Sequence, residues 1–170
     1  MSILEDAKRM AVDPALGLIL VHWSVPHLPV IYNRRAGDFT WNKECNYLDN
    51  LALADRALGE VRRAMEAAGL WDSAVVLVTS DHPLKIKRWA NKFPHIPAED
   101  AAAIGRGLDP RIPFVLKLAG QQESITFDPA MNTVLTHDLF LGLLRGELST
   151  PESVVSWLER RRSDAEGVNH

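Results

Sequence analysis

An apolar run, residues 74–79, ends in Ser80, Asp81 and His82, and the last two have side chains that can bind a metal or transfer a proton. Such a run between helical patterns is typical of a buried strand in a parallel sheet, and ligands gather at the carboxyl ends of these strands. A carboxylate beside an imidazole at this place indicates a divalent-metal site. These donors suit zinc or manganese better than calcium or magnesium, which prefer all-oxygen sites. The alternative is that Asp81 caps a turn and His82 lies on the surface, since short motifs often occur without a function.

A second apolar run, residues 16–23, predicts another buried strand that also ends beside imidazoles. Proline cannot continue a ladder of strand hydrogen bonds, so the chain must leave the sheet at Pro26 and Pro29. We expect His22 to be a core histidine near the strand end. His27, held in a stiff turn between the two prolines, is expected to point into a cleft.

Basic residues alternate with aromatic ones in the loop after His82, which contains Lys85, Lys87, Arg88, Trp89, Lys92 and Phe93. Such a mixture can bind nucleic acid, but a net charge of -3 argues against that partner. A local site for the phosphate or sulfate group of a small anionic ester fits better, because the cations follow the predicted metal ligands. Lys85 and Lys87 are therefore candidate substrate contacts.

The elements that position these residues follow an alternating order. The strongest helical pattern covers residues 47–68, with apolar side chains at Leu51, Ala54, Leu58, Val61, Met65 and Ala68. A strand, a long helix and a second strand predict parallel pairing with a right-handed crossover. Further helices are expected at 3–12, 97–107, 132–144 and 149–162, further strands at 112–118 and 124–127, and a long loop at 30–45.

The expected fold class is therefore α/β, a mostly parallel sheet flanked by helices. With 170 residues, 46% hydrophobic and 24% charged, the chain predicts a single globular domain over residues 1–162 and a disordered tail over 163–170. A single cysteine, Cys45, excludes an intrachain disulfide and a zinc site built on several cysteines. Neither a spanning segment nor a signal peptide is predicted, so the chain alone is expected in the cytoplasm.

Short motifs occur in a fixed order along the chain: His22-Trp-Ser-Val-Pro-His27-Leu-Pro29, Tyr47-Leu-Asp-Asn50 with Asp55, Val75 to His82, Ile112-Pro-Phe-Val115 and Asn132-Thr-Val-Leu-Thr-His-Asp138. In this order they resemble the C-terminal half of the sulfatase-like branch of the alkaline phosphatase superfamily. The resemblance covers most of the chain and implies a partial alkaline phosphatase-like domain.

The resemblance implies that Asp81 and His82 are metal ligands and that His27 contacts the phosphate or sulfate of the substrate. Members of this family hydrolyse or transfer such esters through a covalent intermediate, and some are membrane-bound phosphoglycerol or phosphoethanolamine transferases. His137 is a further candidate ligand, as histidines from a later segment are in some members. Alternatively, His137 caps or packs at a helix start, with Asp138 as the residue equivalent to the family's aspartate.

Two departures from the family pattern matter. Pro83 stands where a glycine usually follows the histidine, so the loop must differ locally. No serine, threonine or cysteine lies in the context of the family's nucleophile, because Ser2 is terminal and Cys45 falls in a loop. We therefore expect a sulfatase-like hydrolase or transferase that is inactive alone and needs a separate chain or a longer natural protein, which could be membrane-associated. The alternative is a non-catalytic remnant or interaction module that self-associates.

Overall fold

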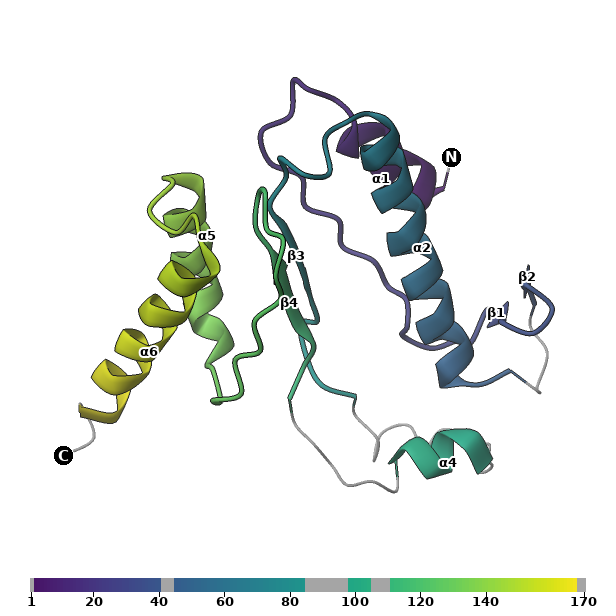
Figure 1. Cartoon of the computed structure of the whole chain (residues 1–170). Helices are drawn as coiled ribbons and strands as arrows, with labels where there is room; N and C mark the ends of the chain where they lie inside the picture. Colours follow the sequence, from purple (N-terminus) through teal and green to yellow (C-terminus); the bar gives the residue numbers. More distant parts are fainter. Residues whose placement is uncertain (1, 41–44, 85–97, 105–110, 168–170) are drawn as a thin grey trace. The chain divides into compact units, whose positions relative to one another are not determined.

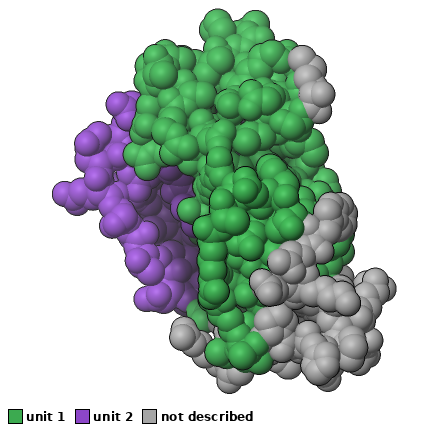
Figure 2. Space-filling view, turned by 90° about the vertical axis from the view of Figure 1, so that its right-hand side faces the viewer, with its two compact units in different colours: residues 1–71, 79–114 green, residues 72–78, 115–170 purple. Residues whose placement is uncertain are grey.

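The computed structural model of the chain describes residues 2–40, 45–84, 98–104 and 111–167 (Figure 1). It combines helices with short strands, so the predicted mixture of the two is confirmed. The chain divides into two compact units, shown in different colours in Figure 2. Unit 1 contains residues 1–71 and 79–114, and unit 2 contains residues 72–78 and 115–170.

Two helices form the centre of unit 1. Helix α1, Ile3–Ala11, begins at Ser2, whose hydroxyl accepts the amide of Glu5 at 3.3 Å. Helix α2, Tyr47–Ala67, packs against α1. Each of the two helices contains a buried alanine, Ala7 on α1 and Ala57 on α2, which are 2% and 0% exposed. The short helix α4, Ala98–Ile104, also belongs to unit 1.

The predicted loop at 30–45 contains a small hairpin. Strands β1, Tyr32–Asn33, and β2, Asp38–Phe39, pair antiparallel with Tyr32 opposite Phe39. The side-chain oxygen of Asn33 accepts the amide of Ala36 at 3.0 Å, and Gly37 has a φ of 75°, a left-handed conformation that glycine adopts without strain. These turn residues are the local reason for the hairpin.

Strands β3, Val76–Thr79, and β4, Phe114–Lys117, confirm two of the predicted strand positions and form a second sheet. The amide of Gly120, just after β4, donates to the carbonyl of Asp72, just before β3, at 2.7 Å. The end of one strand therefore lies beside the beginning of the other, as in an antiparallel pair. Both sheets in the described part of the chain are antiparallel pairs, so the mostly parallel sheet is not observed there.

Two of the predicted strands are absent from the described structure: neither residues 16–23 nor residues 124–127 belong to a strand. Within the first segment Leu18 and Leu20 are 61% and 87% exposed. An apolar run indicates that a segment is suited to a sheet interior, but a strand forms only where neighbouring strands supply its hydrogen bonds. Residues 16–23 are apolar as a buried strand would be, but the prediction that they form a strand is wrong for the described structure.

The buried face of α2 also differs from the prediction. Leu51 and Leu58 are both 38% exposed, whereas Asn50, Leu53 and Ala57 are buried. The face that includes Leu53 and Ala57 is covered within unit 1, and a polar side chain, Asn50, lies on it. The prediction placed the buried face of α2 along its largest apolar residues. It is wrong, because Leu51 and Leu58 lie on a side of the helix that is partly exposed.

Unit 2 is built around a helical pair, α5, Thr136–Leu144, and α6, Pro151–Gly167. A single 3-10 turn, η1, Thr133–Leu135, precedes α5. Leu139 is fully buried, and a Cβ on Gly142 would lie 2.7 Å from the side chain of Leu148, so the connection after α5 passes close to the helix.

Helix α6 begins as predicted, with the hydroxyl of Thr150 accepting the amide of Ser153 at 3.2 Å and Pro151 in the first position. It continues to Gly167, beyond the predicted start of the tail at residue 163, and the added residues include the helix formers Ala165 and Glu166. Among the described helices, none has the length and apolar character needed to cross a membrane.

Candidate functional site

Asp81 and His82 lie in the bend that follows β3, as expected from the sequence. The hydroxyl of Ser80 donates to the carbonyl of His82 at 2.9 Å, which closes this bend with a side chain instead of a further strand bond. The side chain of Asp81 is 75% exposed and that of His82 is 36% exposed. Both groups are therefore accessible to a ligand from solution.

The imidazole of His82 is oriented by its own backbone. Its Nδ1 lies 2.8 Å from the carbonyl oxygen of Pro83, and since a carbonyl only accepts, Nδ1 carries the proton. In the neutral ring the lone pair is then on Nε2, the atom that can bind a metal. Metal-binding histidines commonly donate their other ring N–H to a backbone carbonyl in this way.

Nε2 of His82 lies 4.0 Å from Oδ1 of Asp81. Two ligand atoms on one tetrahedral zinc ion are about 3.3 Å apart, so a small side-chain rotation would bring both onto the same ion. The pair therefore fits a divalent ion by donor type and by spacing. Among the described residues, no three His, Cys, Asp or Glu side chains form a group that could hold a metal ion, so the pair has no third such ligand in this part of the chain.

His27 lies in the loop between the two prolines, and its ring is exposed. Its Nδ1 donates to the carbonyl of Leu28 at 2.9 Å, which again leaves Nε2 without a backbone partner. The loop is attached to α2 by Asn50, whose amide nitrogen donates to the carbonyl of His27 at 3.1 Å. His27 does not join Asp81 and His82 in a group of three metal-competent side chains among the described residues.

The remaining predicted residues are distributed over the chain. His22 is exposed, so the expectation of a core histidine is wrong; it belongs to the segment 16–23 that lacks strand neighbours. His137 lies at the start of α5 in unit 2, where its Nδ1 is 3.0 Å from Oδ1 of Asp138. Lys85 and Lys87 lie outside the described residues.

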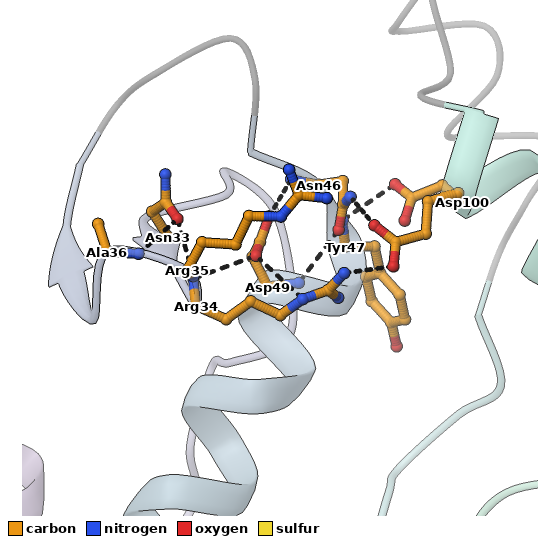
Figure 3. A network of polar contacts seen from close by, with 9 residues as sticks. Asn33, Arg34, Arg35, Ala36, Asn46, Tyr47, Asp49 and Asp100 are labelled. Atoms are coloured by element: carbon orange, nitrogen blue, oxygen red, sulfur yellow. Dashed lines mark hydrogen bonds and ion pairs between the residues drawn. The ribbon is translucent and has the colours of Figure 1, made fainter.

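The first turn of α2 organises the loops of unit 1 (Figure 3). Asn46 and Asp49 form a capping box, in which each side chain accepts the backbone amide of the other, at 3.2 and 2.8 Å. The carboxylate of Asp49 also accepts the backbone amide of Arg34 at 3.1 Å. This second bond attaches the β1–β2 hairpin to the helix start.

Helix α4 is attached to the same turn by two carboxylates. Glu99 binds the guanidinium of Arg34 and accepts the side-chain amide of Asn46 at 3.0 Å. Asp100 accepts the backbone amide of Tyr47 at 2.9 Å, although only 2% of Asp100 is exposed and its Oδ1 has no hydrogen-bond partner. A carboxylate at a helix N-terminus also interacts favourably with the helix dipole.

The two carboxylates have opposite electrostatic environments. Burial raises the pKa of Asp100 above its usual value, against the lowering effect of the amides of Tyr47 and Leu48. The hydrogen bond from Arg34, followed by that from Asn46, lowers the pKa of Glu99. By linkage, Asp100 favours the folded state below its usual pKa and loses that contribution as the pH rises. Glu99 favours the folded state above its usual pKa and loses that contribution as the pH falls.

Two isosteric variants should therefore respond to pH in opposite directions. Asp100→Asn removes a buried charge, so its stability relative to wild type should increase between about pH 4 and pH 7. Glu99→Gln removes a paired charge whose pKa is lowered, so its relative stability should decrease as the pH rises up to about 5 and should stay level above that. Urea unfolding at several pH values measures both differences. If the stabilities of both variants relative to wild type changed with pH in the same direction, the opposite pKa shifts of Asp100 and Glu99 would be contradicted.

The buried residues Asn50 and Asp100 make long-range contacts that the sequence does not predict. Their hydrogen-bond partners lie 19 to 24 residues away for Asn50 and 53 residues away for Asp100, so no local pattern predicts the contacts. The sequence does contain a local signal for the start of α2, because the spacing of Asn46 and Asp49 is that of a capping box.

Comparison of the chain with protein-family models, with curated proteins and with solved structures finds no match.

Proposed function

We propose that this chain contributes part of the active site of a sulfatase-like, metal-dependent hydrolase or transferase that acts on phosphate or sulfate esters. Asp81 and His82 would hold a divalent ion, zinc or manganese, and His27 would contact the anionic group of the ester. The parallel sheet of such enzymes is part of the proposal. The observation that carries it is the arrangement of Nε2 of His82 4.0 Å from the Asp81 carboxylate, with Nδ1 bound to a carbonyl.

The proposed roles follow from the chemistry of each group. A bound divalent ion polarises an ester oxygen and stabilises the charge that develops on it. Asp81 and His82 supply one anionic oxygen and one neutral nitrogen, and the carbonyl of Pro83 keeps the ring in the tautomer that binds. A protonated His27 ring can donate through Nε2 to an anionic oxygen. No residue of the chain matches the family's nucleophile, so the proposal includes a second polypeptide segment that supplies the nucleophile and the remaining ligands.

Metal titration tests this proposal. We expect calorimetry to show zinc or manganese binding to the wild type. In Asp81→Ala and in His82→Ala the metal affinity should fall by at least about tenfold, because removing even a hydrogen-bond partner of a metal ligand has an effect of that size. His22→Ala removes an exposed imidazole outside the pair and should bind like the wild type. His137→Ala tests the further candidate ligand. Equal metal uptake by the wild type and by the Asp81→Ala/His82→Ala double variant would overturn the proposed site.

The second candidate is a non-catalytic interaction module with the same fold. The exposure of Leu16, Leu18 and Leu20, at 42%, 61% and 87%, favours it, because a soluble monomer rarely exposes neighbouring large apolar side chains without a partner. The same titration separates the two candidates. A folded wild-type chain that binds neither metal would leave the interaction module as the better account.

A further inference from the structure

The loop that carries His27 has more hydrogen-bond acceptors than donors. Pro26 and Pro29 have no backbone N–H, so each contributes a carbonyl without a matching amide. Within the loop, the amide of His27 donates to the carbonyl of Ser24 at 2.8 Å. Carbonyls that leave water without finding a donor cost free energy, so this loop depends on donors from elsewhere in the chain.

Asn50 supplies these donors from α2. Its side-chain nitrogen lies 3.4, 3.1 and 3.1 Å from the carbonyl oxygens of Pro26, His27 and Pro29. Its side-chain oxygen accepts the amide of Ile31 at 3.0 Å. The nitrogen has two N–H groups, so the three carbonyls share two donors, and the oxygen adds the contact to Ile31.

The burial of Asn50 makes these contacts specific. The residue is 0% exposed, so water cannot replace a missing partner without a rearrangement. The acceptor bond from Ile31 fixes which end of the carboxamide is oxygen, and the three carbonyls fix the other end as nitrogen. An aspartate of the same size would place an oxygen against those carbonyls, and an alanine would leave them without a donor.

We propose that Asn50 is the positioning residue for His27, an inference that rests on the proposed function of His27 as an anion contact. Asn50 acts through the loop backbone and does not touch the anion. By holding the carbonyls of the loop, it keeps the carbonyl of Leu28 in place to accept Nδ1–H of His27, and the protonated ring then directs Nε2–H toward the anion. Loss of Asn50 would release the ring, even if α2 itself stayed intact.

Nuclear magnetic resonance of the histidine rings tests the proposal in the whole chain. In the wild type, the neutral His27 ring should be predominantly the Nδ1–H tautomer. In Asn50→Asp and in Asn50→Ser, which keeps one donor and leaves room for water, it should shift toward the Nε2–H tautomer. Titration with inorganic phosphate, followed on the same ring, should show at least a tenfold loss of affinity. The rings of His22 and His82 serve as internal controls and should not change their tautomers.

The possible outcomes are separable. A folded Asn50 variant with the wild-type His27 tautomer and phosphate affinity would overturn the positioning role. If the wild type itself binds no phosphate, the anion role of His27 fails, while the tautomer shift still decides whether Asn50 positions the ring. If neither variant folds, hydrogen exchange in the wild type decides: the Ile31 amide and the Asn50 side-chain protons should exchange slowly, and fast exchange at both would overturn the proposal.

Discussion

Replacing Asp49 with alanine is expected to lower the free energy of unfolding by about 2–4 kcal/mol, because one buried carboxylate serves three partners. Loss of a helix cap costs about 0.5–2 kcal/mol, and a buried amide left without an acceptor costs about 1–3 kcal/mol. The carboxylate accepts the amides of Asn46 and Arg34 at 2.8 and 3.1 Å and lies 3.7 Å from the Arg34 guanidinium. Urea unfolding followed by circular dichroism measures the loss.

Asp55 provides a matched control for this experiment, since it is an aspartate on the same helix but is exposed. The Asp55→Ala variant should stay within about 0.5 kcal/mol of the wild type, as most surface substitutions do. Asp49→Asn keeps an acceptor for one amide and should fall between Asp49→Ala and the wild type. If Asp49→Ala and Asp55→Ala were equally stable, the first turn of α2 would not have the organising role described above.

Replacing Leu139 with alanine is expected to destabilise unit 2 by about 2–5 kcal/mol, the usual range for a leucine truncated in a packed core. Leu139 is 0% exposed and lies on the inner side of α5. Truncation to alanine leaves a cavity in the packed interior around Leu139. Hydrogen exchange of the α5 and α6 amides, measured with thermal unfolding, should show lower protection across both helices.

Leu144 offers the same substitution on the same helix at a position that is 59% exposed. Leu144→Ala creates no cavity and keeps a good helix former, so the change should be less than about 0.5 kcal/mol. A loss at Leu144 as large as that at Leu139 would show that α5 is not buried on the side that contains Leu139.

The helices were the most predictable part of the fold, because their ends depend on neighbouring residues. Ser2 caps α1, Thr150 and Pro151 begin α6, and glycines with a φ of 70° and 71°, Gly69 and Gly146, follow the ends of α2 and α5. Each of these signals acts over three or four residues. Local signals therefore place the start of α6 and the ends of α2 and α5, whereas the end of α6, at Gly167, lies beyond the predicted residue 162.

Strand pairing and the covered side of α2 were less predictable, because both depend on residues distant in the sequence. The run 16–23 has the composition of a buried strand, yet composition does not indicate which strand lies beside it. Asparagine is unfavourable in a helix interior, and a buried carboxamide without partners would be costly. Asn50 is nevertheless stable there because its side chain bonds to four residues between Pro26 and Ile31.

The candidate site was predictable only where it is local. Asp81 and His82 are adjacent in the chain, so their proximity follows from the sequence. The orientation of the His82 ring depends on the three-dimensional structure. The attachments of the surrounding loops are long-range: Asp100 reaches Tyr47 and Asn50 reaches the His27 loop. Side-chain-to-backbone bonds of this kind leave no periodic pattern from which they could be inferred.

The exposed segment from Gly17 to Trp23 has a consequence for the behaviour of the chain at high concentration. Uncharged, β-branched and leucine-rich stretches of six or seven residues without proline are the sequences that stack into cross-β fibrils. With Leu20 87% exposed, this stretch is available to identical stretches on other molecules before any unfolding occurs. A lysine at position 20 would act as a gatekeeper against such stacking and would sacrifice no buried contact.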